Sequence, residues 1–378
     1  MSDAQRKMYI FLFVLTVVTT LGFQSWRTLI NNFSVEVVHI NGQQMGLLQS
    51  IREIPGFLAL LVVYLLLFFK EHKLAALSVI VLGIGISITG YFSSIYGLIF
   101  STLLMSFGFH YYETLNQSLT LQYFDQTQAP MIMGRLRGIS SLVNIISGAI
   151  VFSLAFWLNY AQIFFLIGML TILGGIWAWL QDPEDKNLPH QNKKMILRKK
   201  YWLFYVLTLL AGARRQIFVA FAVFLLVKKF HYTIFETSIL FVLNNILSYY
   251  FSPLLGKAIN YFGERKVLSL EYTALIFIFT VYAFCDNKWI VGLMYILDHI
   301  FFNFAIAIRS YFQKIADPLD IAPSMAVGFT INHIVAVIIP VLGGMLWMYD
   351  YRLTFLGGVV FSLISLYFVQ KIKVSVDN

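Results

Sequence analysis

The sequence has few charged residues for its length. Asp, Glu, Lys and Arg make up 12% of its 378 residues, whereas 59% are hydrophobic and 17% are aromatic. Soluble domains carry about 25% charged residues, so this chain has more apolar side chain than a water-exposed fold of its size could bury. The composition therefore argues against a soluble domain and indicates that lipid surrounds part of the chain.

Cysteine and catalytic motifs are also scarce. Cys285 is the only cysteine, so an intramolecular disulfide is excluded. The sequence contains no metal-ligand spacing, no nucleophile elbow and no phosphate-binding loop before a helix. We therefore expect no enzyme activity, no cofactor and no metal. The loops are too short for an ATP-hydrolysing domain, so the energy for any transport should come from a gradient of ions or solute.

Long hydrophobic runs are abundant. They follow one another from Met8 to Ile372 with short polar breaks, and each is long enough to cross a bilayer as a helix of about 20 residues. Backbone polar groups in lipid must be satisfied within the segment, which favours helices and excludes a barrel here. The sequence predicts an all-α integral membrane protein with twelve spans, at residues 8–30, 43–69, 74–92, 95–121, 131–157, 160–181, 201–228, 233–257, 267–285, 288–314, 323–348 and 352–371.

These spans divide into two six-helix bundles, at residues 1–181 and 201–378, joined by a polar, lysine-rich linker at 182–200. Most basic residues lie in loops that share one side if the N-terminus is cytoplasmic, and the positive-inside rule prefers this orientation. We expect cytoplasmic termini, the inner membrane of a bacterium and a monomer. The net charge of +9 is then a topology signal, and nucleic acid is not an expected partner.

The two halves resemble each other in sequence. An offset of 192 aligns Gln24 with Gln216 and Lys73 with Arg265, and an offset of 193 aligns Ala129-Pro130 with Ala322-Pro323. A nearly constant offset close to half the chain length indicates an internal duplication. Two related bundles are the usual plan of a secondary transporter, whose substrate site lies between the repeats near the bilayer midplane.

A motif follows the predicted span 233–257. The segment Gly256-Lys-Ala-Ile-Asn-Tyr-Phe-Gly-Glu-Arg-Lys resembles the cytoplasmic loop signature of the major facilitator superfamily, with Asn260 in place of its usual aspartate. The resemblance implies a twelve-helix secondary transporter of the alternating-access type. It also implies an inner-gate role for this loop, carried by the residues Gly256, Asn260, Gly263, Arg265 and Lys266.

Charges inside the predicted spans need a physical reason, since one charge at a helix centre costs roughly 2.5–3.5 kcal/mol on insertion scales. The spans 74–92, 160–181, 267–285 and 352–371 have none in their interiors, which suits the lipid-facing helices of the resembled fold. The remaining spans hold Arg27, Arg52, Glu53, Glu113, Arg214, Arg215, Asp298 and Arg309.

The predicted substrate-binding residues lie mostly on the span 201–228. Arg214 and Arg215 lie near its middle and point about 100° apart, so we expect one to pair with Asp298 and the other to bind solute. Arginine suits a carboxylate or phosphate because its planar fork donates two hydrogen bonds. Gln24, Gln216 and Asp298 complete the predicted substrate site, and ion pairs that only fix helix packing are the alternative role of these charges.

Proton coupling needs a group that can lose and regain a proton within the membrane. The candidates are Glu113, Asp298 and His299, because a carboxyl in a low-dielectric site can be discharged by an approaching charge. The expected partners are thus lipid, protons and a small polar solute, anionic or zwitterionic. The alternatives are an exporter of amphiphilic drugs or siderophore-like solutes, a polytopic membrane enzyme, and a sensor that does not transport.

Overall fold

The computed structural model describes residues 1–40, 42–185, 188–189, 191, 194–232 and 234–373. Helices dominate these described residues, and no strand occurs among them. The first-half elements are α1 (Asp3–Glu36), α2 (Gly42–Phe57), η1 (Leu58–Leu61), α3 (Val62–Leu65), α4 (Glu71–Thr89), α5 (Ile95–Tyr123), α6 (Gln128–Leu154) and α7 (Tyr160–Leu180).

The second-half elements follow a linker of which residues 186–187, 190 and 192–193 lie outside the described residues. They are η2 (Lys199–Tyr201), α8 (Trp202–Ile217), η3 (Phe218–Ala222), α9 (Val223–Lys228), α10 (Ile234–Phe262), α11 (Glu264–Phe284), α12 (Lys288–Phe302), η4 (Asn303–Ala305), α13 (Ile306–Ile315), η5 (Pro318–Asp320), α14 (Ile321–Tyr349) and α15 (Tyr351–Val369).

The twelve predicted spans coincide with these helices. Eleven helices in the described part of the chain are long and apolar enough to cross a membrane. The twelfth predicted span, 95–121, matches the 29-residue helix α5, which falls outside that set because of its composition. Its second half carries polar side chains at most positions from His110 to Gln122. The all-helical membrane fold is therefore confirmed, and the second half of α5 is polar.

The chain divides into two compact units by contact. Unit 1 comprises Met1–Phe124, Ile139–Ile196 and Pro318–Thr330, and unit 2 comprises Asp125–Gly138, Leu197–Asp317 and Ile331–Asn378. Two helices, α6 and α14, therefore contribute residues to both units. The boundary predicted at residues 182–200 stays a prediction, because the contact units exchange these two short segments.

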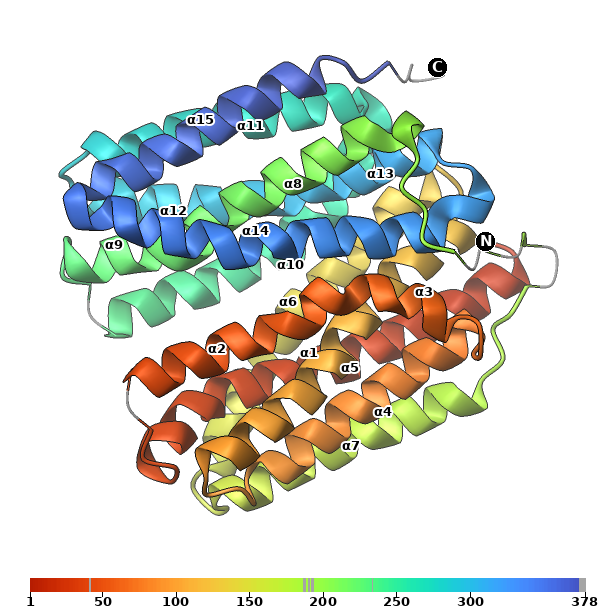
Figure 1. The fold of residues 1–378 in the computed structure, drawn as a ribbon, viewed down its shortest axis with the longest axis horizontal. Helices are drawn as coiled ribbons and strands as arrows, with labels where there is room; N and C mark the ends of the chain where they lie inside the picture. Colours follow the sequence, from red (N-terminus) through yellow and green to blue (C-terminus); the bar gives the residue numbers. More distant parts are fainter. Residues whose placement is uncertain (41, 186–187, 190, 192–193, 233, 374–378) are drawn as a thin grey trace. The chain divides into compact units, whose positions relative to one another are not determined.

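Helix packing follows the same scheme in the two units (Figure 1). In unit 1, α4 packs against α5 and α7, α1 against α7, and α2 against α5. In unit 2, the helices at the corresponding chain positions do the same: α11 packs against α12 and α15, α8 against α15, and α10 against α12. This repetition supports the internal duplication predicted from the offset.

Small residues allow the closest of these packings. A Cβ added at Gly108 of α5 would lie 2.3 Å from the Leu82 backbone nitrogen, and one at Gly85 of α4 would lie 2.3 Å from the Met105 nitrogen. Without side chains at these glycines, α4 and α5 approach backbone to backbone, which is how membrane helices gain packing energy. Gly85 and Gly108 therefore serve packing.

Candidate functional site

A buried ion pair occupies the interior of unit 2. Arg214 of α8 and Glu271 of α11 are 3% and 4% exposed, and Nη2 of Arg214 lies 3.4 Å from Oε1 of Glu271. Arg214 Nη1 also donates to the Ser365 hydroxyl of α15, and its guanidinium carbon lies 4.1 Å from the Tyr272 ring centroid. Contacts from α11 and α15 thus hold this arginine inside unit 2.

The ion-pair partner of Arg214 is Glu271, which the sequence did not predict. The expectation that Arg214 or Arg215 pairs with Asp298 stays a prediction. The predicted span 267–285 also carries an interior charge, since Glu271 lies seven residues after the first residue of α11. The sequence analysis did not count this glutamate among the charges inside the spans. A signal was present, because Glu264 and Glu271 are one heptad apart and so lie on one face.

Asp298 lies in the same buried region on α12. It is 3% exposed, it interacts electrostatically with both Glu271 and Arg214, and the Tyr282 side chain of α11 lies beside it. Among the described residues, the buried polar atoms that lack a hydrogen-bond partner include Oδ2 of Asp298, Oε2 of Glu271 and the hydroxyl of Tyr282. The cluster therefore brings two acidic side chains to one arginine, with hydrogen-bonding capacity left over.

Both predicted site helices of unit 2 are interrupted next to these charges. A turn of π-helix, η3, follows Arg214, Arg215 and Gln216 of α8 directly, and a 3₁₀ turn, η4, begins one turn after His299 of α12. Irregular turns within membrane helices survive only where protein or water satisfies the backbone. Such breaks mark binding sites in transporters and are frequent at functional sites generally.

Asn303 stabilises the second interruption. It accepts a 2.9 Å hydrogen bond from Nε of Arg137 and donates a 3.2 Å hydrogen bond to Ser248 of α10. All three residues belong to unit 2. The predicted coupling residue His299 is half-buried one turn earlier, where its ring lies 6.2 Å from the Phe218 ring of η3. Sequence reasoning missed Arg137 and Asn303, because their partners are distant in the chain.

The structure does not bring the other predicted substrate and coupling residues together in one cluster. Arg215 and Gln216 are half-buried on α8, one and two residues after Arg214, and their side chains leave the helix in other directions. Gln24 is half-buried on α1 of unit 1. Glu113 is half-buried on α5, beside Tyr112, whose hydroxyl hydrogen-bonds to Thr16 at 3.0 Å.

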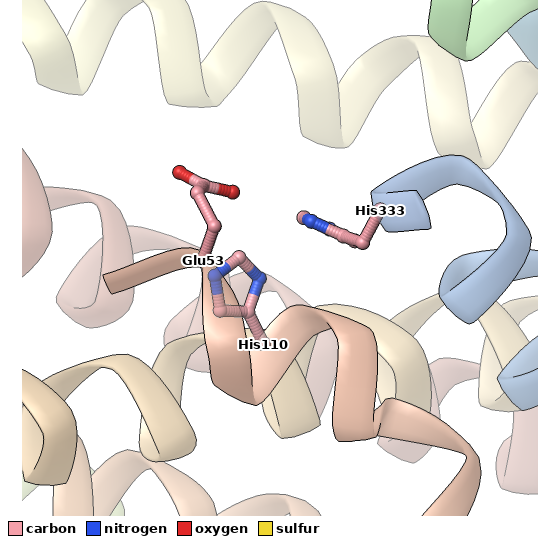
Figure 2. Close-up of side chains that lie close together, drawn as sticks. All are labelled: Glu53, His110 and His333. Atoms are coloured by element: carbon pink, nitrogen blue, oxygen red, sulfur yellow. The ribbon is translucent and has the colours of Figure 1, made fainter. Parts of the chain in front are cut away.

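Unit 1 has a polar cluster of its own, on α2 and α5. Arg52 and Glu53 form an ion pair with 2.7 Å between Nη2 and Oε1, and the Ser106 hydroxyl donates to the Arg52 carbonyl. Figure 2 shows the Glu53 and His110 side chains, whose potential metal-ligating atoms lie within 4.8 Å of each other. His333, also labelled there, belongs to unit 2. Within unit 1, Glu53 and His110 give two ligand atoms, and Arg52 already neutralises the carboxylate.

The predicted gate loop forms the turn between α10 and α11. Asn260 donates a 2.6 Å hydrogen bond to the Thr127 carbonyl, and Arg265 donates a 3.1 Å hydrogen bond to Gln370. Gly263 has φ 80°, which favours glycine, and a Cβ at Gly256 would lie 2.5 Å from the Pro130 carbonyl oxygen. Both motif glycines thus have a steric reason. The last residue of the motif, Lys266, is exposed.

Thr127, the partner of Asn260, is held by a helix cap. The Asp125 carboxylate accepts hydrogen bonds from the Thr127 hydroxyl and from the Thr127 and Gln128 amides. Burial alone would raise the pKa of Asp125, but these hydrogen bonds outweigh it and lower the pKa. An ionised Asp125 therefore caps α6 and fixes the carbonyl that Asn260 binds.

A second polar network occurs twice, at the predicted offset. In unit 2, Glu264 accepts a 2.6 Å hydrogen bond from Ser310 and forms a 2.9 Å ion pair with Lys314. The corresponding residues of unit 1 are Glu71, Ser118 and Gln122, of which Gln122 donates at 2.8 Å to both others. Each glutamate is the first residue of its helix, α11 or α4.

The aligned basic residues also have equivalent roles. Lys73 donates a 2.9 Å hydrogen bond to the Gln181 carbonyl at the end of α7, and Arg265 bonds the Gln370 side chain at the end of α15. The two bonds tie the third helix of each half to its sixth. Spacing and contacts thus agree on the duplication.

The comparisons with known proteins give a family. Residues 3–318 match the family model described as Major Facilitator Superfamily. No curated protein matches the sequence.

Similar solved structures span the chain almost completely. The human organic anion transporter MFSD10 (TETRAN) has a TM-score of 0.80 at 11% identity, covering 98% of this chain and 100% of its own. A bacterial homologue of the iron transporter ferroportin, in an outward-facing state, has a TM-score of 0.78 at 14% identity, with 96% and 98% covered. A variant of the E. coli fucose:proton symporter, FucP, has 0.77 at 11%, with 97% and 98% covered. These identities establish likeness of fold.

Proposed function

The chain belongs to the Major Facilitator Superfamily, and on this premise we propose that it moves a small anionic or zwitterionic solute by proton-coupled alternating access. Family and fold identify a membrane transporter and not an enzyme. Similar structures serve solutes as different as organic anions and fucose. The choice of solute class therefore rests on the side chains of this chain.

One observation carries the proposal: ionisable residues lie three to five residues before the breaks of two membrane helices. Arg215 and Gln216 precede the π-turn of α8, and Asp298 and His299 precede the 3₁₀ turn of α12. Arg214 is engaged by Glu271, and we assign solute binding on α8 to Arg215, which is half-buried and lies closer to the π-turn. Its guanidinium suits a carboxylate or phosphate group, and Gln216, Gln24 and Asp298 supply further polar contacts in this proposal.

The remaining predicted residues take conformational roles in the proposed cycle. Asn260 and Arg265 hold the inner gate through their bonds to Thr127 and Gln370, and Lys266 lies beside them. Glu113, Asp298 and His299 are the candidates for proton coupling. We place both termini in the cytoplasm and the protein, as a monomer, in a bacterial inner membrane, since the basic loops support this orientation.

Solute-induced thermal stabilisation of the purified protein tests the solute class. The probes are succinate, glutamate, glucose and tetraphenylphosphonium, applied to the wild type, to Arg215→Gln and to Arg352→Gln as a matched control at an exposed arginine. A ligand at 100 times its Kd stabilises by about 2.7 kcal/mol. We expect succinate or glutamate to raise the Tm of the wild type and of Arg352→Gln, and not of Arg215→Gln.

Transport is then measured with the stabilising probe in proteoliposomes. Accumulation that follows an imposed pH gradient, and that Arg215→Gln abolishes, supports the whole proposal. Stabilisation by glucose or tetraphenylphosphonium alone, unchanged in Arg215→Gln, would overturn the anionic class. Uptake that ignores the pH gradient would overturn proton coupling.

A further inference from the structure

The buried cluster of unit 2 contains more acid than base. Glu271 and Asp298 both interact with Arg214. The other titratable groups that face the cluster are hydroxyls: Tyr272 lies under the guanidinium, Tyr282 lies beside Asp298, and Tyr295 of α12 lies near Tyr282. The Ser365 hydroxyl of α15 closes the remaining side of Arg214. Within the described residues, Arg214 is thus the cation that acts on both carboxyls.

One guanidinium balances one carboxylate. A second ionised carboxylate would leave a net negative charge in an interior where all three residues are no more than 4% exposed. Removing an ion from water costs several kcal/mol unless an opposite charge compensates it. Two buried carboxyls beside one cation avoid that cost by holding one proton between them, as paired carboxyls do elsewhere.

Carboxyl oxygens without a hydrogen-bond partner are available in the cluster to carry that proton. Oε2 of Glu271 and Oδ2 of Asp298 are buried without a hydrogen-bond partner in the described structure. A protonated carboxyl becomes a donor where a carboxylate can only accept. Each of the two acids therefore has a buried oxygen that could carry the proton, and the other keeps an oxygen able to accept a hydrogen bond.

The duplicated half shows that the fold does not need these charges. At the offset of 192, the counterparts of Arg214, Glu271 and Asp298 are Gly22, Val79 and Ser106. All three are buried in unit 1, which packs its helices by the same scheme. The three charges are thus particular to unit 2, which favours a role beyond the helix packing that both halves share.

We propose that Glu271 and Asp298 share one exchangeable proton beside Arg214, and that its release drives the transport cycle. On release the carboxylic O–H bond breaks, the electron pair stays on the carboxylate and the proton passes to water as hydronium. Arg214 then faces two carboxylates, which changes the balance of attraction among α8, α11 and α12. The coupling step rests on the proposed function, whereas the proton site does not.

Infrared spectroscopy of the purified protein at neutral pH tests the site through the carbonyl band of a protonated carboxylic acid. The charge count predicts one such group in the wild type. Glu271→Gln and Asp298→Asn should each remove it, because one acid and one arginine form a simple ion pair. Arg214→Gln should double it, since neither acid then has a cation. Other carboxyls contribute equally to all spectra and cancel in differences against the wild type.

The neutral triple variant Arg214→Gln/Glu271→Gln/Asp298→Asn keeps the shapes of both acidic side chains and leaves no charge in the cluster. It should also lack the band, so the test survives an unstable single variant. Bands unchanged in the single and triple variants would overturn the proton site. This readout needs no transported solute. If the band behaves as expected but a sodium gradient drives uptake of the stabilising probe, the coupling role fails and the proton site stands.

Discussion

Lys314 offers a sharp test of the duplicated Glu-Ser network, because the other half shows what replaces it. Its Nζ lies 2.9 Å and 3.1 Å from the two carboxylate oxygens of Glu264, which is 2% exposed. In unit 1 the same position is Gln122, bonded to Glu71. Lys314→Gln therefore places in unit 2 the same glutamine that bonds the equivalent glutamate in unit 1.

The expected loss in stability follows from the partners that remain. Removing one member of a buried pair costs about 3–5 kcal/mol when the other charge is left alone. Here Ser310 still donates to Glu264, the glutamine supplies one hydrogen bond, and the first position of α11 places the carboxylate at a favourable helix end, worth about 0.3–1 kcal/mol. A charged hydrogen bond exceeds a neutral one by about 1–1.5 kcal/mol, so we expect a net loss of that size.

The assay is thermal unfolding of the purified protein in detergent. A loss of about 1–1.5 kcal/mol corresponds to a Tm lower by about 1–3 °C for a chain of this size. Lys314→Met, which removes the hydrogen bond too, should lower the Tm further, whereas Lys257→Gln at an exposed position of α10 should leave it unchanged. Equal Tm values for Lys314→Gln, Lys314→Met and the wild type would refute this account.

Three other substitutions test separate features. Gly108→Ala should destabilise by about 1–3 kcal/mol, because its Cβ would overlap the α4 backbone, while Gly148→Ala, which meets nothing within 4 Å, should not lower the Tm. Gly263→Ala should cost about 1–2 kcal/mol from its φ of 80°, and a Tm equal to wild type would contradict this strain. Asn260→Ala should leave the Tm within about 1 kcal/mol of wild type, the value of one hydrogen bond, but change the uptake rate of the stabilising probe; an unchanged rate would remove Asn260 from the gate.

The sequence predicted the spans well because hydrophobic length is a local property. The predicted 201–228 and 288–314 match the helical stretches Lys199–Lys228 and Lys288–Ile315. The interruptions inside both stretches were not predicted. The 3₁₀ turn at Asn303 is held by Arg137 and Ser248, which are distant in sequence. Hydropathy is a local average and does not predict such partners.

The site was predicted less well for the same physical reason. Sequence reasoning identified Arg214 and Asp298 as buried charges, but which acid pairs with Arg214 depends on how α8, α11 and α12 pack. Glu271 lies 57 residues from Arg214, and its position near the start of a predicted span hid its burial. Helical geometry did predict that Arg214 and Arg215 face different surroundings, and Arg214 is the buried one.

Internal duplication offers a way to distinguish polar residues that maintain the fold from polar residues that take part in transport. The Glu-Ser network at the starts of α4 and α11 occurs in both halves, as a structural element should. The cluster around Arg214 occurs once. By the same criterion we expect the ion pair of Arg52 and Glu53 to be functional, since its counterparts at the offset of 192 are Asn244 and Asn245. Arg52→Asn/Glu53→Asn would make the halves alike, so we expect the Tm to change little and uptake of the stabilising probe to be lost. A large drop in Tm with uptake retained per folded molecule would show that the unrepeated pair serves the fold and that the criterion fails.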